Sequence, residues 1–194
     1  MPPATDSIRA FLDYLSHEAA ASPLTIETYQ SDLRNFTAYA EERLGEPFVP
    51  SEGDLDLVRG WLSVKLDEGL KASTVGRCLT SIRSFYRHLL KTGQIKRNPI
   101  QALRPPKAAR PLPVYVPTED MEQMLSEEVD PTDWRAVRDH LILTMLYECG
   151  LRRSEIAGLR DQAVDTTERQ LKVLGKGRKE RIVPFGKGLA EEIE

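Results

Sequence analysis

Residues 149–159 read CGLRRSEIAGL, and this stretch decides the fold expected around it. It follows the apolar run LILTMLY at 141–147, which predicts a buried helix rather than a surface one. Gly150 is the residue type that most often ends a helix in a left-handed turn. The residues from Ser154 onward predict a second helix, with Glu155 near its positive N-terminal end. The sequence therefore predicts a tight helix-to-helix junction that holds a pair of arginines.

The arginine pair at this junction, Arg152 and Arg153, has two interpretations. A buried or half-buried arginine in a protein normally makes an ion pair. Arginine also carries a planar fork of donors that suits a phosphate group. Taken alone, the stretch favours the ion pair, and the rest of the chain has to decide between the two.

Charge is distributed unevenly along the 194 residues, although the formal net charge is only −3. Residues 71–110 hold ten Lys and Arg and neither Asp nor Glu, whereas residues 1–70 have a net charge of −8 and residues 111–194 one of −5. An unbroken positive block in a chain that is 29% charged indicates a polyanionic partner. The alternative for any charge run is an ordinary solvated face.

Periodic apolar residues predict four helices in the first half of the chain, at about 7–15, 22–44, 55–66 and 73–91. Ser22 is a suitable N-cap for the second helix, and Pro23 suits its first position. Gly93 is the expected stop of the fourth helix. The basic residues of this fourth helix lie largely opposite its apolar stripe, which favours contact with an anionic surface.

A proline-rich segment divides the chain. Residues 104–117 read RPPKAARPLPVYVP, and their five prolines exclude a helix interior. The segment is interpreted as an extended, semi-rigid, basic linker. It predicts a helical domain at 1–103 and a second domain at 118–194.

The second domain changes character along its length. Thr118-Glu119-Asp120 predicts a helix cap, and Pro131-Thr132-Asp133-Trp134 the start of the next helix. Two short β-prone segments, at 169–174 and 181–185, flank the turn GKGRKE, whose Lys176 is by itself no more than a solvated lysine. Residues 188–194 predict a helix that is just starting, and we interpret this end as a cut rather than a natural terminus.

Composition argues against several other classes of protein. No run of about 18 or more apolar residues is present, and the N-terminus lacks the layout of a leader peptide, so a cytoplasmic location and no membrane partner are expected. Cys78 and Cys149 stand alone without C-x-x-C spacing and are interpreted as small buried residues. No disulfide, metal site or cofactor is predicted.

Four motifs in a fixed order carry a resemblance to a known family: Thr25-x-x-x-Tyr29-x-x-Asp32-Leu33-x-x-Phe36; the stretch from Ser73-Thr74 through Arg83-Ser84-Phe85-Tyr86 to Asn98-Pro99; Gly150-Leu151-Arg152-Arg153-Ser154-Glu155; and Gly175-Lys176-Gly177-x-Lys179-Glu180-Arg181-x-Val183-Pro184. The whole chain resembles the N-terminal two-thirds of a tyrosine recombinase of the phage integrase group, most closely its bacterial Xer-like members. The resemblance implies a mainly α fold. A four-helix-type core-binding (SAM-like) domain would precede part of an α+β catalytic domain with a small β-hairpin or sheet.

The resemblance also implies a C-shaped clamp on double-stranded DNA at a recombination site, within a recombinase tetramer on paired sites. The second and fourth helices would lie at the major groove, and Lys and Arg would neutralise phosphates. The matching positions imply the following DNA-facing residues: Thr25, Tyr29, Lys71, Ser73, Thr74, Arg77, Ser81, Arg83, Arg87, Arg153 and Arg178.

In this family a tyrosine hydroxyl attacks a scissile phosphate and forms a 3′-phosphotyrosyl bond without a metal ion. The resemblance assigns Arg152 to the non-bridging oxygens, Glu155 to the support of that arginine, and Lys176 to protonation of the leaving oxygen. Arg153 departs from the small or apolar residue usual at its position, and is interpreted as a phosphate contact or an ion pair.

The remaining family motifs are missing from these residues. None of the three histidines begins a His-x-x-Arg motif, and the last tyrosine, Tyr147, falls on the helix expected to be buried. We therefore expect a chain that binds DNA but cannot cleave it. One alternative is a naturally short, non-catalytic relative that occupies recombination sites or a partner recombinase. The other is a helical transcription regulator, which would explain the basic helix but not Lys176.

Overall fold

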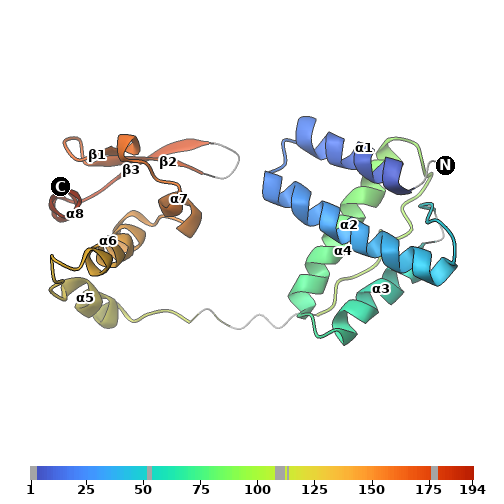
Figure 1. Cartoon of the computed structure of the whole chain (residues 1–194), viewed down its shortest axis with the longest axis horizontal. Coiled ribbons are helices and arrows are strands. Elements are labelled where there is room, and N and C mark those ends of the chain that lie inside the picture. Colours follow the sequence, from blue (N-terminus) through green and yellow to red (C-terminus); the bar gives the residue numbers. More distant parts are fainter. Residues whose placement is uncertain (1–3, 52–53, 108–111, 113, 176–178) are drawn as a thin grey trace. The chain divides into compact units, whose positions relative to one another are not determined.

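The computed structural model describes residues 4–51, 54–107, 112, 114–175 and 179–194, and divides the chain into two compact units at 1–111 and 112–194 (Figure 1). The division falls within the proline-rich segment, whose described residues form neither helix nor strand. Helices dominate both units, and the described residues add one small antiparallel sheet. The expected mainly α fold class is confirmed.

The described part of the first unit is a bundle of four helices, as predicted: α1 (Ala4–His17), α2 (Pro23–Leu44), α3 (Leu55–Asp67) and α4 (Ala72–Lys91). Ser22 caps α2, because its Oγ accepts a hydrogen bond from the backbone N–H of Thr25 at 3.2 Å. Gly45 ends α2 with a left-handed φ of 70°, and Gly93 follows α4 with a φ of 72°. The N-cap of α2 and the stop after α4 were both correctly predicted.

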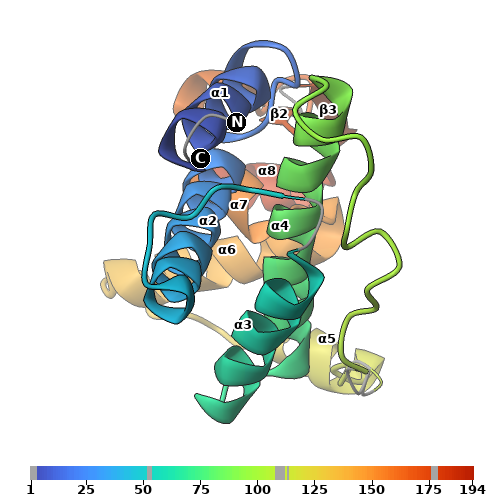
Figure 2. The same cartoon turned by 90° about the vertical axis from the view of Figure 1, so that its right-hand side faces the viewer.

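α4 lies at the centre of this unit, against the other three helices (Figures 1 and 2). Its predicted apolar stripe is buried throughout, and consists of Val75, Leu79, Ile82, Phe85, Tyr86 and Leu89. Phe85 meets Phe11 of α1 edge-on, with 5.7 Å between ring centroids. The Tyr86 hydroxyl donates to the buried Asp54, just before α3, at 2.5 Å. Apolar contacts and a buried hydrogen bond together fix which face of α4 remains polar.

The second unit combines short helices with a three-stranded sheet. The helices are α5 (Thr118–Ser126), α6 (Trp134–Cys149), α7 (Arg153–Ala157) and α8 (Lys187–Ile193), with a 3-10 turn, η1, at Asp161–Ala163. The sheet has the order β1-β2-β3, from β1 (Val164–Asp165), β2 (Gln170–Leu174) and β3 (Glu180–Pro184). The predicted hairpin is confirmed as β2 and β3. β1 was not predicted, because two residues are too few to show a period.

The core of the second unit joins one face of the sheet to two helices. Leu171 and Val173 of β2 are buried with Met145 and Cys149 of α6 and Leu189 of α8. The alternation along β2 sends Lys172 and Leu174 to the opposite, exposed face. The hairpin therefore packs into the core through one face only, and its register pairs the buried Val173 of β2 with Arg181 of β3.

Two predictions about the helices of this unit are wrong. α6 is not buried throughout: Ile142 is 37% exposed and Tyr147 is 49% exposed. A continuous apolar run does not show which side of a helix is buried. Among the described residues, neighbouring elements cover only part of the circumference of α6. Thr118 does not cap α5 either, since the N-cap position is Pro117 and no side-chain bond is made there. α6 does begin at Trp134 as predicted.

The described residues include no helix that is long and apolar enough to cross a membrane. Cys78 and Cys149 are free and buried, which confirms their interpretation as small core residues. Among the described side chains, no cluster of His, Cys, Asp and Glu is suited to a metal ion.

Candidate functional site

The junction between α6 and α7 places a buried carboxylate beside the first arginine of the pair. Gly150 ends α6 with a left-handed φ of 58°, and Arg152 is the N-cap of α7. Glu155 reaches back from the first turn, and its Oε2 accepts from the backbone N–H of Arg152 at 2.8 Å. The Glu155 side chain is only 3% exposed. The junction predicted from the sequence is confirmed, with Glu155 at the positive end of α7.

Glu155 makes ion pairs with arginines from two elements. Its Oε1 accepts from Arg152 Nη1 at 2.8 Å and from Arg181 Nη1 of β3 at 2.6 Å, while its Oε2 accepts from Arg181 Nη2 at 2.9 Å. The Arg181 guanidinium, followed by the Arg152 amide, holds the pKa of Glu155 far below its usual range. Glu155 raises the pKa of Arg181 in turn. The cluster therefore contains one ionised carboxylate and two guanidinium groups.

Arg181 was missed by the reasoning from sequence, although it lies in the fourth quoted motif. The signal that could have found it is the alternation along β3. Arg181 and Val183 are half-buried, whereas Glu180 and Ile182 are exposed. A charged residue at an inward-facing strand position needs a partner of opposite charge, because an unpaired buried charge is costly.

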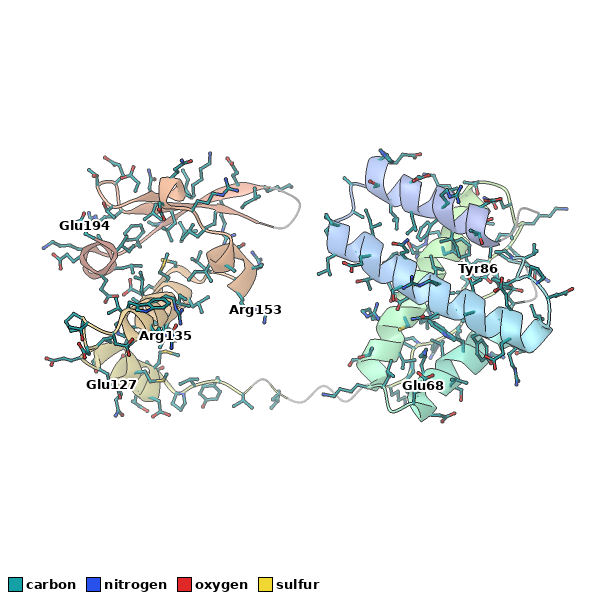
Figure 3. All side chains as sticks on the ribbon, viewed as in Figure 1. Glu68, Tyr86, Glu127, Arg135, Arg153 and Glu194 are labelled. Carbon is teal, nitrogen blue, oxygen red and sulfur yellow. The ribbon has the colours of Figure 1, made fainter. Side chains whose placement is uncertain are left out.

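Arg152 differs from Arg181 in how much of its guanidinium is occupied. Its side chain is 67% exposed, and within the described residues only Nη1 makes a side-chain hydrogen bond. Its remaining N–H groups are free to bind an anion. Arg153 projects from α7 away from the sheet (Figure 3) and makes no ion pair with any described residue. Arg153 was interpreted as either a phosphate contact or half of an ion pair, and the described residues include no acidic partner for the ion pair.

The turn that carries Lys176 and Arg178 falls on residues 176–178, which lie outside the described residues. Its flanks are joined by a hydrogen bond from Gly175 N to Lys179 O at 2.8 Å. A Cβ at Gly175 would lie 3.5 Å from Arg181 Nη1 and 3.7 Å from Glu155 Oε1. The base of the hairpin turn is therefore packed next to the arginine–glutamate cluster.

A second buried carboxylate, Asp32 of α2, joins α2 to α4 in the first unit. Arg77 donates Nη1 to Oδ2 at 2.7 Å and Nη2 to Oδ1 at 3.2 Å. Ser81 donates to Oδ2 at 2.5 Å. The hydrogen bond to Asp32 raises the pKa of Arg77, and burial raises the pKa of the neighbouring Cys78 thiol. One carboxylate thereby fixes two side chains on successive turns of α4.

The structure contradicts the DNA-facing assignment of Ser81, which is fully buried. The physical reason is that Ser81 lies one turn beyond Arg77 on the side of α4 that faces α2, where Asp32 accepts a hydrogen bond from its hydroxyl. Arg77 keeps 46% of its side chain exposed, but both terminal nitrogens bind Asp32. One cation of the basic block is therefore already neutralised by a residue far away in the sequence.

The other assigned residues of α2 and α4 lie at or near the surface. Thr25 is half-buried, with its hydroxyl 2.8 Å from Ser22 Oγ, and the half-buried Tyr29 stacks on Phe11. The remaining ones are exposed or half-buried: Lys71, Ser73, Thr74, Arg83 and Arg87.

The C-terminal half of α4 borders a polar hollow of about 340 Å³. Its polar lining consists of Arg83 and Arg87, one turn apart on α4, with Asn98 and Gln101 from the segment that follows. Arg83 Nε is buried and has no hydrogen-bond partner among the described residues. Two cations and two amides around one hollow form a candidate anion site, because such side chains are typical phosphate ligands.

Comparison with known families and proteins assigns the class of the chain. Residues 8–93 match "Phage integrase, N-terminal SAM-like domain", and residues 115–194 match "Phage integrase family". The chain belongs to the phage integrase family, the tyrosine recombinases. Within that family it is Xer-like: it is 36% identical over 194 residues to tyrosine recombinase XerC of Pelobacter propionicus, and the match covers all of this chain and 64% of that protein.

Other relatives agree with this assignment. Identity to tyrosine recombinase XerC of Escherichia coli O1:K1 / APEC is 34% over 187 residues, covering 96% of this chain and 61% of that protein. The chain thus spans about three-fifths of the length of these relatives. A lambda integrase tetramer bound to a Holliday junction shares the fold with a TM-score of 0.66 at 16% identity, covering 95% of this chain and 51% of that one. The Tn1549 transposon integrase in complex with transposon right end DNA also has a TM-score of 0.66, at 18% identity, covering 96% and 63%.

Replacing Asp32 tests whether it joins α2 to α4. In Asp32→Ala the buried Ser81 hydroxyl and the Arg77 guanidinium lose their shared acceptor. We expect a loss of about 2–4 kcal/mol in the free energy of unfolding, as for other broken buried ionic clusters. Urea unfolding followed by the fluorescence of the buried Trp61 measures it.

The matched control is Asp56→Ala on α3, which removes an exposed ion pair with Arg59 whose side chains are 57% and 93% exposed. This change should alter the same free energy by less than about 0.5 kcal/mol. Equal losses in the two variants would show that Asp32 does not join the helices.

Proposed function

We propose that this chain binds double-stranded DNA at a site-specific recombination site and supplies the anion-binding part of a tyrosine recombinase active site. The observation that carries the proposal is Arg152. Its guanidinium is exposed, it is anchored by the buried Glu155, and it lies in the domain that matches the phage integrase family. The basic side chains along α4 support the DNA-binding half of the proposal.

The reaction proposed for the recombinase is a transfer of a DNA phosphate to a tyrosine. The tyrosine hydroxyl attacks the scissile phosphorus, a 3′-phosphotyrosyl bond forms, and the 5′ oxygen leaves as a hydroxyl. Arg152 would bind the non-bridging oxygens, where negative charge increases toward the transition state. Lys176 would donate the proton that the leaving oxygen requires. Glu155 would keep Arg152 in place, and no metal ion or other cofactor takes part.

The DNA grip is proposed to involve both units. Arg83 and Arg87 would bind backbone phosphates at the hollow beside α4, and Arg153 and Arg178 would add phosphate contacts near the scissile bond. The remaining proposed contacts are Thr25, Tyr29, Lys71, Ser73 and Thr74. Arg77 would contribute mainly by joining α4 to α2 through its ion pair with Asp32.

Assembly and location follow from the same proposal. One structural neighbour is described as a lambda integrase tetramer bound to a Holliday junction. By analogy, we propose a tetramer on paired recombination sites for this recombinase. Because chromosomal and mobile-element DNA in bacteria lies in the cytoplasm, that is the proposed location.

Salt-dependent DNA binding tests the role of α4. Each phosphate contact contributes about −0.9 to the slope of log K against log salt, so Arg83→Ala with Arg87→Ala should make the slope shallower by about 1.8. Mobility shifts with a duplex at several salt concentrations give the slope. Arg59→Ala on α3 removes an exposed cation from outside the proposed interface and should leave the slope unchanged. If the double variant matched this control, α4 would not be the DNA-binding helix.

A trapping assay tests the proposed limit on chemistry. The 194 residues contain no tyrosine after Tyr147 and no His-x-x-Arg motif. We therefore propose that the 194-residue polypeptide retards a nicked suicide duplex without becoming attached to it, so denaturing gels should show no covalent complex. A covalent complex that disappears in Tyr147→Phe would contradict this and identify the half-exposed Tyr147 as the nucleophile.

A further inference from the structure

The Glu155 cluster has an excess of one positive charge. Glu155 contributes one negative charge, and Arg152 and Arg181 contribute one positive charge each. The carboxylate is almost completely buried, at 3% exposure, so water does little to screen it from the arginines. The net charge of the cluster therefore depends on both guanidinium groups being present.

The two arginines are bound differently to the same carboxylate. Arg181 forms a fork with both terminal nitrogens on both carboxylate oxygens, at 2.6 and 2.9 Å. Arg152 makes one side-chain contact, at 2.8 Å, and is 67% exposed, against 38% for Arg181. Arg181 is directed at Glu155, whereas Arg152 still offers donors to solvent.

We propose that Arg181 is a positioning residue that neutralises Glu155, so that Arg152 keeps an uncompensated positive charge for a phosphate diester or monoester. Without Arg181, the cluster would be a simple Arg152–Glu155 pair of zero net charge, and the carboxylate would repel the anion that Arg152 has to bind. This inference rests on the proposed function in one respect, namely that the ligand of Arg152 is a phosphate.

Arg181 also ties the hairpin to the junction. It lies on β3 and Glu155 on α7, so their ion pair spans two elements that are 26 residues apart in the sequence. Gly175 lies at the base of the turn, where a Cβ would be in van der Waals contact with Arg181 Nη1 at 3.5 Å and with Glu155 Oε1 at 3.7 Å. If Arg181 had a purely structural role, phosphate binding would depend on this ion pair alone. Restoring the net charge of the cluster without the ion pair would then not restore phosphate binding.

Two substitutions and their combination separate the two roles. Arg181→Met removes the charge that neutralises Glu155. Glu155→Gln keeps the shape of the side chain but removes the negative charge, which leaves Arg152 and Arg181 both unopposed. The combination of Arg181→Met and Glu155→Gln restores a net charge of one while abolishing the ion pair.

The experiment is a titration of the ¹⁵N-labelled 194-residue chain with inorganic phosphate, followed through the Arg152 Nε–Hε resonance. This resonance is assigned by its absence in Arg152→Lys. We expect a saturable shift in the unmodified chain and a dissociation constant about three- to tenfold higher in Arg181→Met. The change is this modest because solvent screens much of the interaction between one unit charge and an anion bound at the exposed Arg152. The double variant should return to within about twofold of the original value.

The control removes a cation elsewhere in the same unit. Lys187→Met on α8 takes away a side chain that is 79% exposed and pairs with Glu191, and it should leave phosphate binding unchanged. If Arg181→Met does not fold, Glu155→Gln alone decides: it should bind phosphate at least as tightly as the unmodified chain.

Three results would overturn the inference. One is the absence of any Arg152 response in the unmodified chain, and another is weaker binding in Glu155→Gln. The third is a double variant that remains as weak as Arg181→Met, which would make the ion pair purely structural. A chain that binds phosphate as expected but fails to retard duplex DNA would contradict the proposed function and leave the role of Arg181 intact.

Discussion

The second unit depends on one buried interaction, the carboxylate of Glu155 held between the guanidinium groups of Arg152 and Arg181. Burying an ionised carboxylate is costly unless charged donors surround it. Here three side-chain and one backbone hydrogen bond meet it, at distances from 2.6 to 2.9 Å. The same contacts fix the N-terminus of α7 and the inward-facing position on β3, and they lie next to the base of the turn at Gly175. The geometry of the candidate active site therefore follows from the hydrogen bonds and ion pairs that stabilise the buried carboxylate of Glu155.

The first unit uses a buried carboxylate to a different end. Asp32 binds both terminal nitrogens of Arg77 and the hydroxyl of Ser81, so that the charge of Arg77 is balanced where it stands. Glu155, by contrast, is shared by two arginines, and one of them keeps free donors. One carboxylate paired with one arginine has no net charge and only joins two helices. One carboxylate shared by two arginines keeps a net positive charge that can bind an anion. This difference separates an anchoring arginine from one suited to bind a phosphate.

Local patterns in the sequence predicted most of the fold but not the partners across it. The helices of the first unit follow from apolar periodicity and from caps such as Ser22, and the junction at Gly150 follows from a left-handed glycine after an apolar run. The pairing of Asp32 with Arg77, 45 residues apart, leaves no local signal, and Ser81 was therefore assigned to the surface when it is buried. The partner of Arg181, 26 residues away, also leaves no local signal, although the alternation along β3 does mark Arg181 as inward-facing. Tyr147 was placed in the core because an apolar run does not show which of its sides is covered.

The most direct measurement is the titration of the Glu155 side-chain carboxyl by ¹³C NMR. The pKa of Glu155 is held below the ordinary value of 4.5 mainly by Arg181, so the carboxyl should remain ionised when ordinary glutamates have become protonated. Because the folded-state pKa is the lower one, the stabilising effect is complete above pH 4.5 and is lost as the pH falls below that value. In Arg181→Met the midpoint should move up toward 4.5. A midpoint at or above 4.5 in the unmodified chain would contradict the account, because Glu155 could not then be the charge that holds both arginines.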